Sequence, residues 1–159
     1  MQQEAGESDE VLAEVAELYR VPLKGGEAEY IADKISVSVS GVTGIGDMVL
    51  YSTEEGLQAY FPKTKKTKTI KKGERIYNVT SRLSDGKAVV RQVMGDSENS
   101  DYYICDKEGS LEKIGNTPLI FLAAYDHVTY AIDKNGWVAL DTKKWQKGEF
   151  EVRYSFQAQ

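Results

Sequence analysis

The stretch HVTYAIDKNGWVALDT, residues 127–142, decides the fold class of this chain. β-Branched and aromatic residues lie on both sides of its polar segment DKN, which a glycine follows directly. A period of two is that of a β-strand, and glycine adopts the positive φ that a tight hairpin turn needs. We therefore predict a β-hairpin in which Val138 and Leu140 face the interior of the protein. Trp137 and Ala139 are expected to face the other way.

The same outline recurs in MVLYSTEEGLQAYFP (residues 48–62) and DYYICDKEGSLEKI (residues 101–114). In all three segments a polar residue directly precedes the turn glycine, which is Gly56, Gly109 or Gly136. We expect a positive φ at each of these glycines, because a side chain at such a turn position is strained. The recurrence predicts several hairpins of one kind along a single chain.

A partial further copy lies near the start, where ELYRVPLKGGEAEYI (residues 17–31) aligns with GLQAYFPKTKKTKTI (residues 56–70). Together the segments repeat at about 40 residues with about four strands per unit, which is the period of a β-propeller blade. LYRVPLKGGEAEYI and GWVALDTKKW (residues 136–145) resemble blade repeats of TolB-like, quinoprotein-like and LDL-receptor-like β-propellers. The resemblance implies an all-β fold of repeated antiparallel four-stranded units, arranged as a small or partial β-propeller. The alternative is a β-sandwich of the same strands.

The size of the chain and its tryptophans limit what the resemblance implies. Most propellers of these families have about six to eight blades, whereas a chain of 159 residues has room for about four. Quinoprotein-like repeats keep a tryptophan-docking pattern that only Trp137 and Trp145 echo here. No quinone site follows from the resemblance, and we predict no cofactor.

The chain divides into an acidic N-terminal segment, residues 1–16, and a single all-β repeat domain, residues 17–159. Apolar residues of the stretch 9–18 have helical spacing, which indicates a short helix in the first twenty residues. The alternative is a tail that becomes ordered only when it docks. We also expect residues 149–156, which have one apolar face, to pair with residues 19–23 and to close the repeats into a ring.

Composition limits the classes of partner. The net charge of −5 disfavours general binding to nucleic acid. The longest apolar run, residues 119–124, is far shorter than the roughly 20 residues of a membrane-spanning helix, so no membrane span is predicted. The single cysteine, Cys105, excludes an internal disulfide. The acidic start is typical of sequences that follow a signal-peptide cleavage site, which favours an extracytoplasmic location.

Residues with catalytic or metal-binding potential are few. His127 is the only histidine, and a Cys105–His127 dyad requires that the two side chains meet in space. The loop GDSENSD contains Asp96, Glu98 and Asp101, which are oxygen donors of the kind that calcium binds, although a solvated loop is the simpler interpretation. Asp106 and Asp133 occupy equivalent positions, three residues before a turn glycine, which indicates that they form turns. We predict no catalytic residue and no metal site.

The stretch KTKKTKTIKKGER carries the densest positive charge of the chain. Alternating lysine and threonine are typical of an exposed edge strand that resists pairing with other molecules. A second interpretation is an anion-facing strip, for which Lys65, Lys66 and Lys68 are the candidate binding residues. A third is that the acidic N-terminal segment folds back over the strip.

Two classes of function are consistent with these features. The first is a non-enzymatic binding or protein-interaction module with a protein or glycan partner, for which ten tyrosines and two tryptophans supply contact surface. Its candidate ligand-binding residues are Trp137, Trp145, Lys65, Lys66 and Lys68. The second is a carbohydrate-active hydrolase or lyase with a carboxylate site at one end of the strands. An enzyme of that kind needs two or three carboxyl groups that converge in a cleft and have shifted pKa values.

Overall fold

The computed structural model describes residues 15–36, 42–73, 77–93 and 97–156. It is an all-β protein with 63% strand and 3% helix, and its sheets are antiparallel and not closed. The strand content is far above the usual ~20–25%, so the predicted fold class is confirmed at this level.

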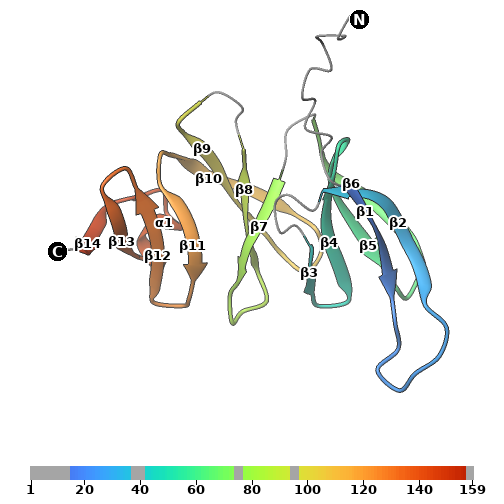
Figure 1. The fold of residues 1–159 in the computed structure, drawn as a ribbon. Helices are drawn as coiled ribbons and strands as arrows, with labels where there is room; N and C mark the ends of the chain where they lie inside the picture. The colour runs from blue at the N-terminus through green and yellow to red at the C-terminus, as the bar shows by residue number, and fades with distance from the viewer. Residues whose placement is uncertain (1–14, 37–41, 74–76, 94–96, 157–159) are drawn as a thin grey trace, which may run out of the picture.

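Three antiparallel sheets follow one another along the chain and lie side by side (Figure 1). The first sheet contains six strands: β1 (Val15–Arg20), β2 (Glu29–Ser36), β3 (Val42–Ile45), β4 (Met48–Thr53), β5 (Gly56–Phe61) and β6 (Lys66–Lys72). The second contains β7 (Tyr77–Arg82), β8 (Ala88–Gln92), β9 (Ser100–Cys105) and β10 (Leu111–Thr117). The third contains β11 (Ile120–Ala124), β12 (Val128–Asp133), β13 (Gly136–Asp141) and β14 (Val152–Phe156).

Each sheet contains a run of four strands in which every strand pairs with the next one in sequence. These runs are β3–β6, β7–β10 and β11–β14. The β1–β2 hairpin extends the first sheet through a single bridge, Ile35 to Thr53. The protein is therefore a series of three four-stranded units with a hairpin at one end.

The units pack face to face and bury an apolar core at each junction. Between the first and second sheets, Leu50 and Leu57 meet Tyr77 and Val90. Between the second and third sheets, the core is rich in aromatic side chains, which include Tyr102, Phe121 and Trp145. A third and smaller cluster, which includes Ile35, Tyr51 and Tyr60, lies where the β1–β2 hairpin covers the outer face of the first sheet.

Strand β7 links the three units. It lies in contact with β3 and β4 on one side and with β11 on the other. The guanidinium of Arg82 donates a hydrogen bond to the Gly44 carbonyl in the first sheet (3.1 Å), and Ser81 Oγ accepts one from the Ala124 amide in the third (2.8 Å). These contacts fix the first strands of the four-stranded units next to one another.

The predicted turns are confirmed, but one hairpin has a different place in its unit. Gly56, Gly109 and Gly136 have φ values of 133°, 86° and 128°. Gly56 and Gly136 join the second and third strands of their units, whereas Gly109 joins the third and fourth. The sequence similarity of the three hairpins thus reflects their shared turn chemistry and not one structural position.

The predicted ring closure is wrong. Strand β14 pairs with β13, and β1 pairs with β2, so the segments 149–156 and 19–23 lie at opposite ends of the series (Figure 1). The reason is local pairing: a short helix, α1 (Thr142–Trp145), turns the chain back so that β14 meets the strand that precedes it.

The prediction of a helix in the first twenty residues is also wrong for the part that the structure describes, which begins at residue 15. Residues 15–18, within the stretch of helical spacing, belong to β1, where Val15, Ala16 and Leu18 pair with residues of β2. The described helix is α1 instead, and the Asp141 carboxylate caps it by accepting a hydrogen bond from the Lys144 amide (3.1 Å). The rest of the predicted N-terminal helix and most of the acidic segment lie outside the described residues.

Two turn glycines differ in what an added methyl group would meet. A Cβ at Gly56 would lie 2.0 Å from the Lys71 carbonyl oxygen, whereas a Cβ at Gly136 would be 3.5 Å from its nearest neighbour, the Phe156 carbonyl oxygen. Gly136→Ala should therefore lower the free energy of unfolding by about 1 kcal/mol through φ strain alone. Gly56→Ala should lower it by about 3 kcal/mol or more, because the strand pair must also separate. Urea denaturation of both variants measures the difference, and equal losses would contradict this account.

Candidate functional site

The outer face of the third sheet carries several exposed aromatic side chains. One cross-strand row on this face runs through Ile120, Ile132, Trp137 and Phe156, each directly opposite the next. A second row runs through Ala123, Tyr130, Ala139 and Tyr154. We call these eight residues the aromatic face.

Four aromatic side chains dominate this face. The exposed fractions are 55% for Trp137, 52% for Phe156, 59% for Tyr154 and 36% for Tyr130. A neighbouring ring, that of Tyr125, makes an edge contact with Tyr130 at a centroid distance of 6.3 Å. Aromatic side chains combine a large contact area with few rotatable bonds, which suits them to binding surfaces.

The sequence explains why both faces of this sheet are apolar. Along β12 and β13, Ala131 and Val138 point toward the second sheet and are buried, as the alternation predicts. Tyr130 and Trp137, one residue away, also carry apolar rings and point to the other side. A strand that is apolar on both faces is typical of a sheet covered on both sides.

The aromatic face has a charged edge where β13 ends and β14 begins. Arg153 forms an ion pair with Asp141 at 3.7 Å, and its guanidinium carbon lies 5.7 Å from the centre of the Tyr154 ring. The Lys144 amide donates to the Asp141 carboxylate and holds the pKa of Asp141 below its usual value, so this carboxylate stays ionised beside the arginine. A polar rim around an apolar centre is the usual composition of a protein-binding surface.

The predicted binding residues do not form one site. Trp137 lies on the aromatic face, as its place in the alternation predicts. Trp145 is fully buried in the core between the second and third sheets, so it is not available to a ligand at the surface. Its indole N–H donates to Thr129 Oγ1 (2.7 Å), and Thr129 in turn contacts Thr142 Oγ1 (2.8 Å), which donates to the Tyr125 carbonyl (2.6 Å). This chain of hydrogen bonds ties α1 to the sheet.

The lysine stretch forms the edge of the first sheet. Lys66 and Lys68 are exposed on β6, which within the described ranges pairs with β5 alone. Lys65 lies in the preceding turn at a φ of 55°. The ammonium group of Lys65 lies 3.6 Å from the Glu29 carboxylate on β2. Their positions agree with the interpretation as a protected edge. Folding of the acidic segment over the strip concerns residues 1–14, outside the described part of the chain.

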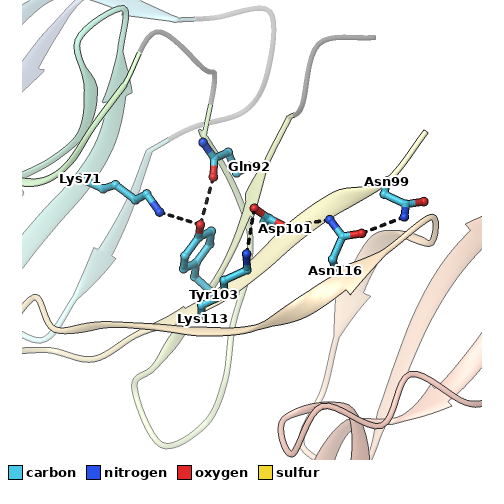
Figure 2. Close-up of polar contacts among 7 residues, drawn as sticks. All are labelled: Lys71, Gln92, Asn99, Asp101, Tyr103, Lys113 and Asn116. Carbon is cyan, nitrogen blue, oxygen red and sulfur yellow. Dashed lines mark hydrogen bonds and ion pairs between the residues drawn. The ribbon is translucent and has the colours of Figure 1, made fainter. Parts of the chain in front are cut away.

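Lys71, from the same stretch, takes part in a polar network between the first and second sheets (Figure 2). Its ammonium group donates to the Tyr103 hydroxyl (2.7 Å) and lies 4.4 Å from the centre of that ring. The Tyr103 hydroxyl donates to Gln92 Oε1 (3.0 Å). The network joins an edge strand to the buried strand β9, which is a structural role.

Asp101 belongs to a neighbouring part of the same polar region. Its carboxylate accepts a hydrogen bond from Asn116 Nδ2 (2.7 Å) and forms an ion pair with Lys113 at 3.4 Å. Figure 2 shows these groups side by side, with Asn99 donating to Asn116. Of the other two oxygen donors considered for calcium, Glu98 is exposed, and Asp96 lies outside the described residues. Among the residues that are described, no group of three or more His, Cys, Asp or Glu side chains could hold a metal ion.

Cys105 and His127 do not form a dyad. The thiol of Cys105 is buried between the first and second sheets, and burial raises its pKa to about 11, so it is protonated at neutral pH. His127 is exposed in the turn between β11 and β12, on the other side of the second sheet. The predicted turn-forming roles of Asp106 and Asp133 are confirmed, because their side chains accept hydrogen bonds from backbone amides two residues further on (3.0 and 2.7 Å).

Two surface depressions contain carboxylates beside residues of turns and strands. One is lined by Glu54, Glu55, Gln58 and Thr69, and Thr69 donates to Gln58 Oε1 at 2.9 Å. Another contains Asp126, whose carboxylate accepts hydrogen bonds from the hydroxyl and the amide of Ser84. These two bonds lower the pKa of Asp126 and connect the turn of the second sheet to that of the third.

Comparison with known proteins gives no match to a protein-family model, to a curated protein or to a solved structure. The helix that the described residues form, α1, has four residues and is not long enough to cross a membrane. The sequence indicated the tyrosines as a group for contact surface, but it did not single out Tyr130, Tyr154 or Phe156. For Tyr130 the signal is that β12 and β13 carry apolar residues at both odd and even positions. Tyr154 and Phe156 belong to the apolar face of residues 149–156.

Mutations of the lysines on the edge strand should have two different effects, one on stability and one on aggregation. Lys71→Gln should lower the free energy of unfolding by about 1.5 kcal/mol, because it removes a charged donor from the hydroxyl of the buried Tyr103. The double variant Lys66→Gln, Lys68→Gln should stay within about 0.5 kcal/mol of the parent but aggregate faster. Denaturation curves and light scattering measure the two effects. The edge interpretation is wrong if the double variant loses stability without a rise in aggregation.

The link between Ser84 and Asp126 should depend on pH. Because the pKa of Asp126 is lowered in the folded state, its stabilising effect is present above the ordinary carboxyl value of about 4 and is lost as the pH falls through the lowered value. Asp126→Asn and Ser84→Ala should therefore destabilise the protein at pH 7 and differ less from the parent near pH 2. Their effects at pH 7 should not add in the double variant. Fully additive effects, or losses that are the same at all pH values, would contradict the assignment.

Proposed function

We propose that the chain is a protein-interaction module built on propeller-like repeats, which contacts its partner through the aromatic face. Support for the repeats comes from three consecutive four-stranded antiparallel units that pack face to face. Their first strands lie next to one another, as the inner strands of propeller blades do.

The observation that carries the proposal is the contrast between the second and third sheets. Every residue of β9 is buried, because neighbouring sheets cover both of its faces. The third sheet has the same apolar character on both faces, yet the described residues cover only one of them. Four partly exposed aromatic side chains of about 150–250 Å² each give roughly 400 Å² of apolar surface, which is within the range of about 300–600 Å² for the largest patch of a monomer, a patch that is often functional.

The size and chemistry of the surface favour a protein over a small molecule as the partner. The aromatic face consists of side chains on the outer surface of paired strands and not of the walls of a pocket. A partner with an apolar surface of its own would bury both, with Arg153 and Asp141 at the rim.

The enzymatic alternative has less support. A general acid needs a raised carboxyl pKa, whereas the two aspartates with shifted values, Asp126 and Asp141, have lowered ones. The hydroxyl and the amide of Ser84 explain the lowered pKa of Asp126, and the Lys144 amide explains that of Asp141.

Site-specific photo-crosslinking tests the proposal. With p-benzoylphenylalanine in place of Tyr130, the full chain expressed in its native host should form protein adducts. The same group in place of Glu112, which is exposed on β10, is the control and should give none. Trp137→Lys in the Tyr130-labelled chain should abolish the adducts, because it places a charge at the centre of the apolar rows. Adducts that are equal at both positions, or that persist with Trp137→Lys, would contradict the proposal.

A further inference from the structure

We propose that the partner is a second copy of this chain, and that two copies join head to tail into a closed ring, with the aromatic face of each covered by the β1–β2 end of the other. The inference rests on the proposed role of the aromatic face as a protein-binding surface. It names the occupant of that face and the geometry of the contact.

The first argument is continuity with the contacts inside the chain. The second sheet packs on the first, and the third packs on the second, each through apolar side chains of facing strands. At the other end, the β1–β2 hairpin packs on the first sheet in the same manner. A further antiparallel layer on the aromatic face would repeat a contact that this chain already makes three times.

The second argument is that the β1–β2 end has a matching surface. Tyr19 and Tyr30 lie opposite each other on the two strands and are 46% and 51% exposed. Their rings meet edge to face at a centroid distance of 5.7 Å. The Tyr19 hydroxyl donates to the Glu17 carboxylate (2.6 Å), so this end pairs aromatic rings with a negative charge. The aromatic face pairs its rings with the guanidinium of Arg153.

The third argument concerns closure. The units of one copy form an open series, and its two ends are different surfaces. Two copies contain six four-stranded units and two hairpins, which falls within the range of about four to eight blades of closed propellers. Head-to-tail contact uses both ends of every copy and closes when the rotation between copies completes a turn, and we place that closure at two copies because their six units match the size of closed propellers.

The fourth argument is area. A stable dimer buries about 800 Å² on each partner, and one aromatic face offers roughly half of that. A dimer in which the two aromatic faces meet each other would have only this contact and would leave Tyr19 and Tyr30 exposed. In a ring each copy makes two contacts, and the area buried on each copy then approaches the value for a stable dimer.

Sedimentation velocity of the purified full chain over a wide concentration range is the test. The expected result is a species of twice the mass of the chain that does not grow further. Trp137→Lys alone, and Tyr19→Lys with Tyr30→Lys, should each give monomers or a dimer weakened at least tenfold. In an equimolar mixture of the two variants, one of the two contacts is intact on both sides, so the mixture should associate more strongly than either variant alone and more weakly than the parent chain. Glu112→Gln, a charge change at an exposed position outside both ends, should leave the dimer intact.

A measurement on the unmodified chain does not depend on the folding of variants. Trp137 is half exposed and Trp145 is buried, so dilution of the dimer should shift tryptophan emission to longer wavelength as Trp137 meets water. A monomer at all concentrations overturns the inference, and so does continued growth into filaments. A dimer that survives the two tyrosine substitutions but not Trp137→Lys also overturns it, since the aromatic faces would then meet each other. If Tyr130 crosslinks to a different protein while the chain stays monomeric, the ring is wrong and the interaction module stands.

Discussion

A β-sheet whose two faces are both apolar must be covered on both, and the rest of this structure depends on that constraint. The second sheet satisfies it completely: Tyr102 and Ile104 point to one neighbour, and Tyr103 and Cys105 to the other. The first and third sheets are held in place because each provides one of these covers. The β1–β2 hairpin covers the second face of the first sheet. The outer face of the third sheet is not covered by the described residues.

Polar contacts between the sheets fix the relative positions that apolar packing alone leaves open. Apolar faces attract without a fixed register, whereas hydrogen bonds select one relative position. Arg82, Ser84 and Ser81 connect the second sheet to its neighbours at the ends of the strands. The Lys71–Tyr103–Gln92 network does the same at the outer edge. The arrangement of the units is thus fixed by a few directional bonds placed around continuous cores.

The parts of the fold that depend on neighbouring residues could be predicted from the sequence. The hairpin at Gly136, the inward direction of Val138 and the turn role of Asp106 all follow from contacts within a few residues. What depends on distant residues could not be predicted in this way. Trp145 and Trp137 are the same residue type eight positions apart in the sequence, but α1 turns Trp145 into the core, where Thr129 accepts its N–H. The prediction of ring closure was wrong for the same reason. The helix before β14 directs this strand to β13, and the residues of β14 themselves do not show this.

The position of Cys105 has a practical consequence for labelling chemistry. Its sulfur is buried, and its pKa of about 11 leaves only about one thiol in ten thousand ionised at pH 7. Maleimides react with the thiolate, so the native cysteine is nearly inert while the protein is folded. A cysteine introduced at an exposed position would then carry a fluorophore or spin label alone, without removal of the native residue. The one thiol of the chain thereby becomes a reporter of unfolding, because it reacts only when the sheets on either side of it separate.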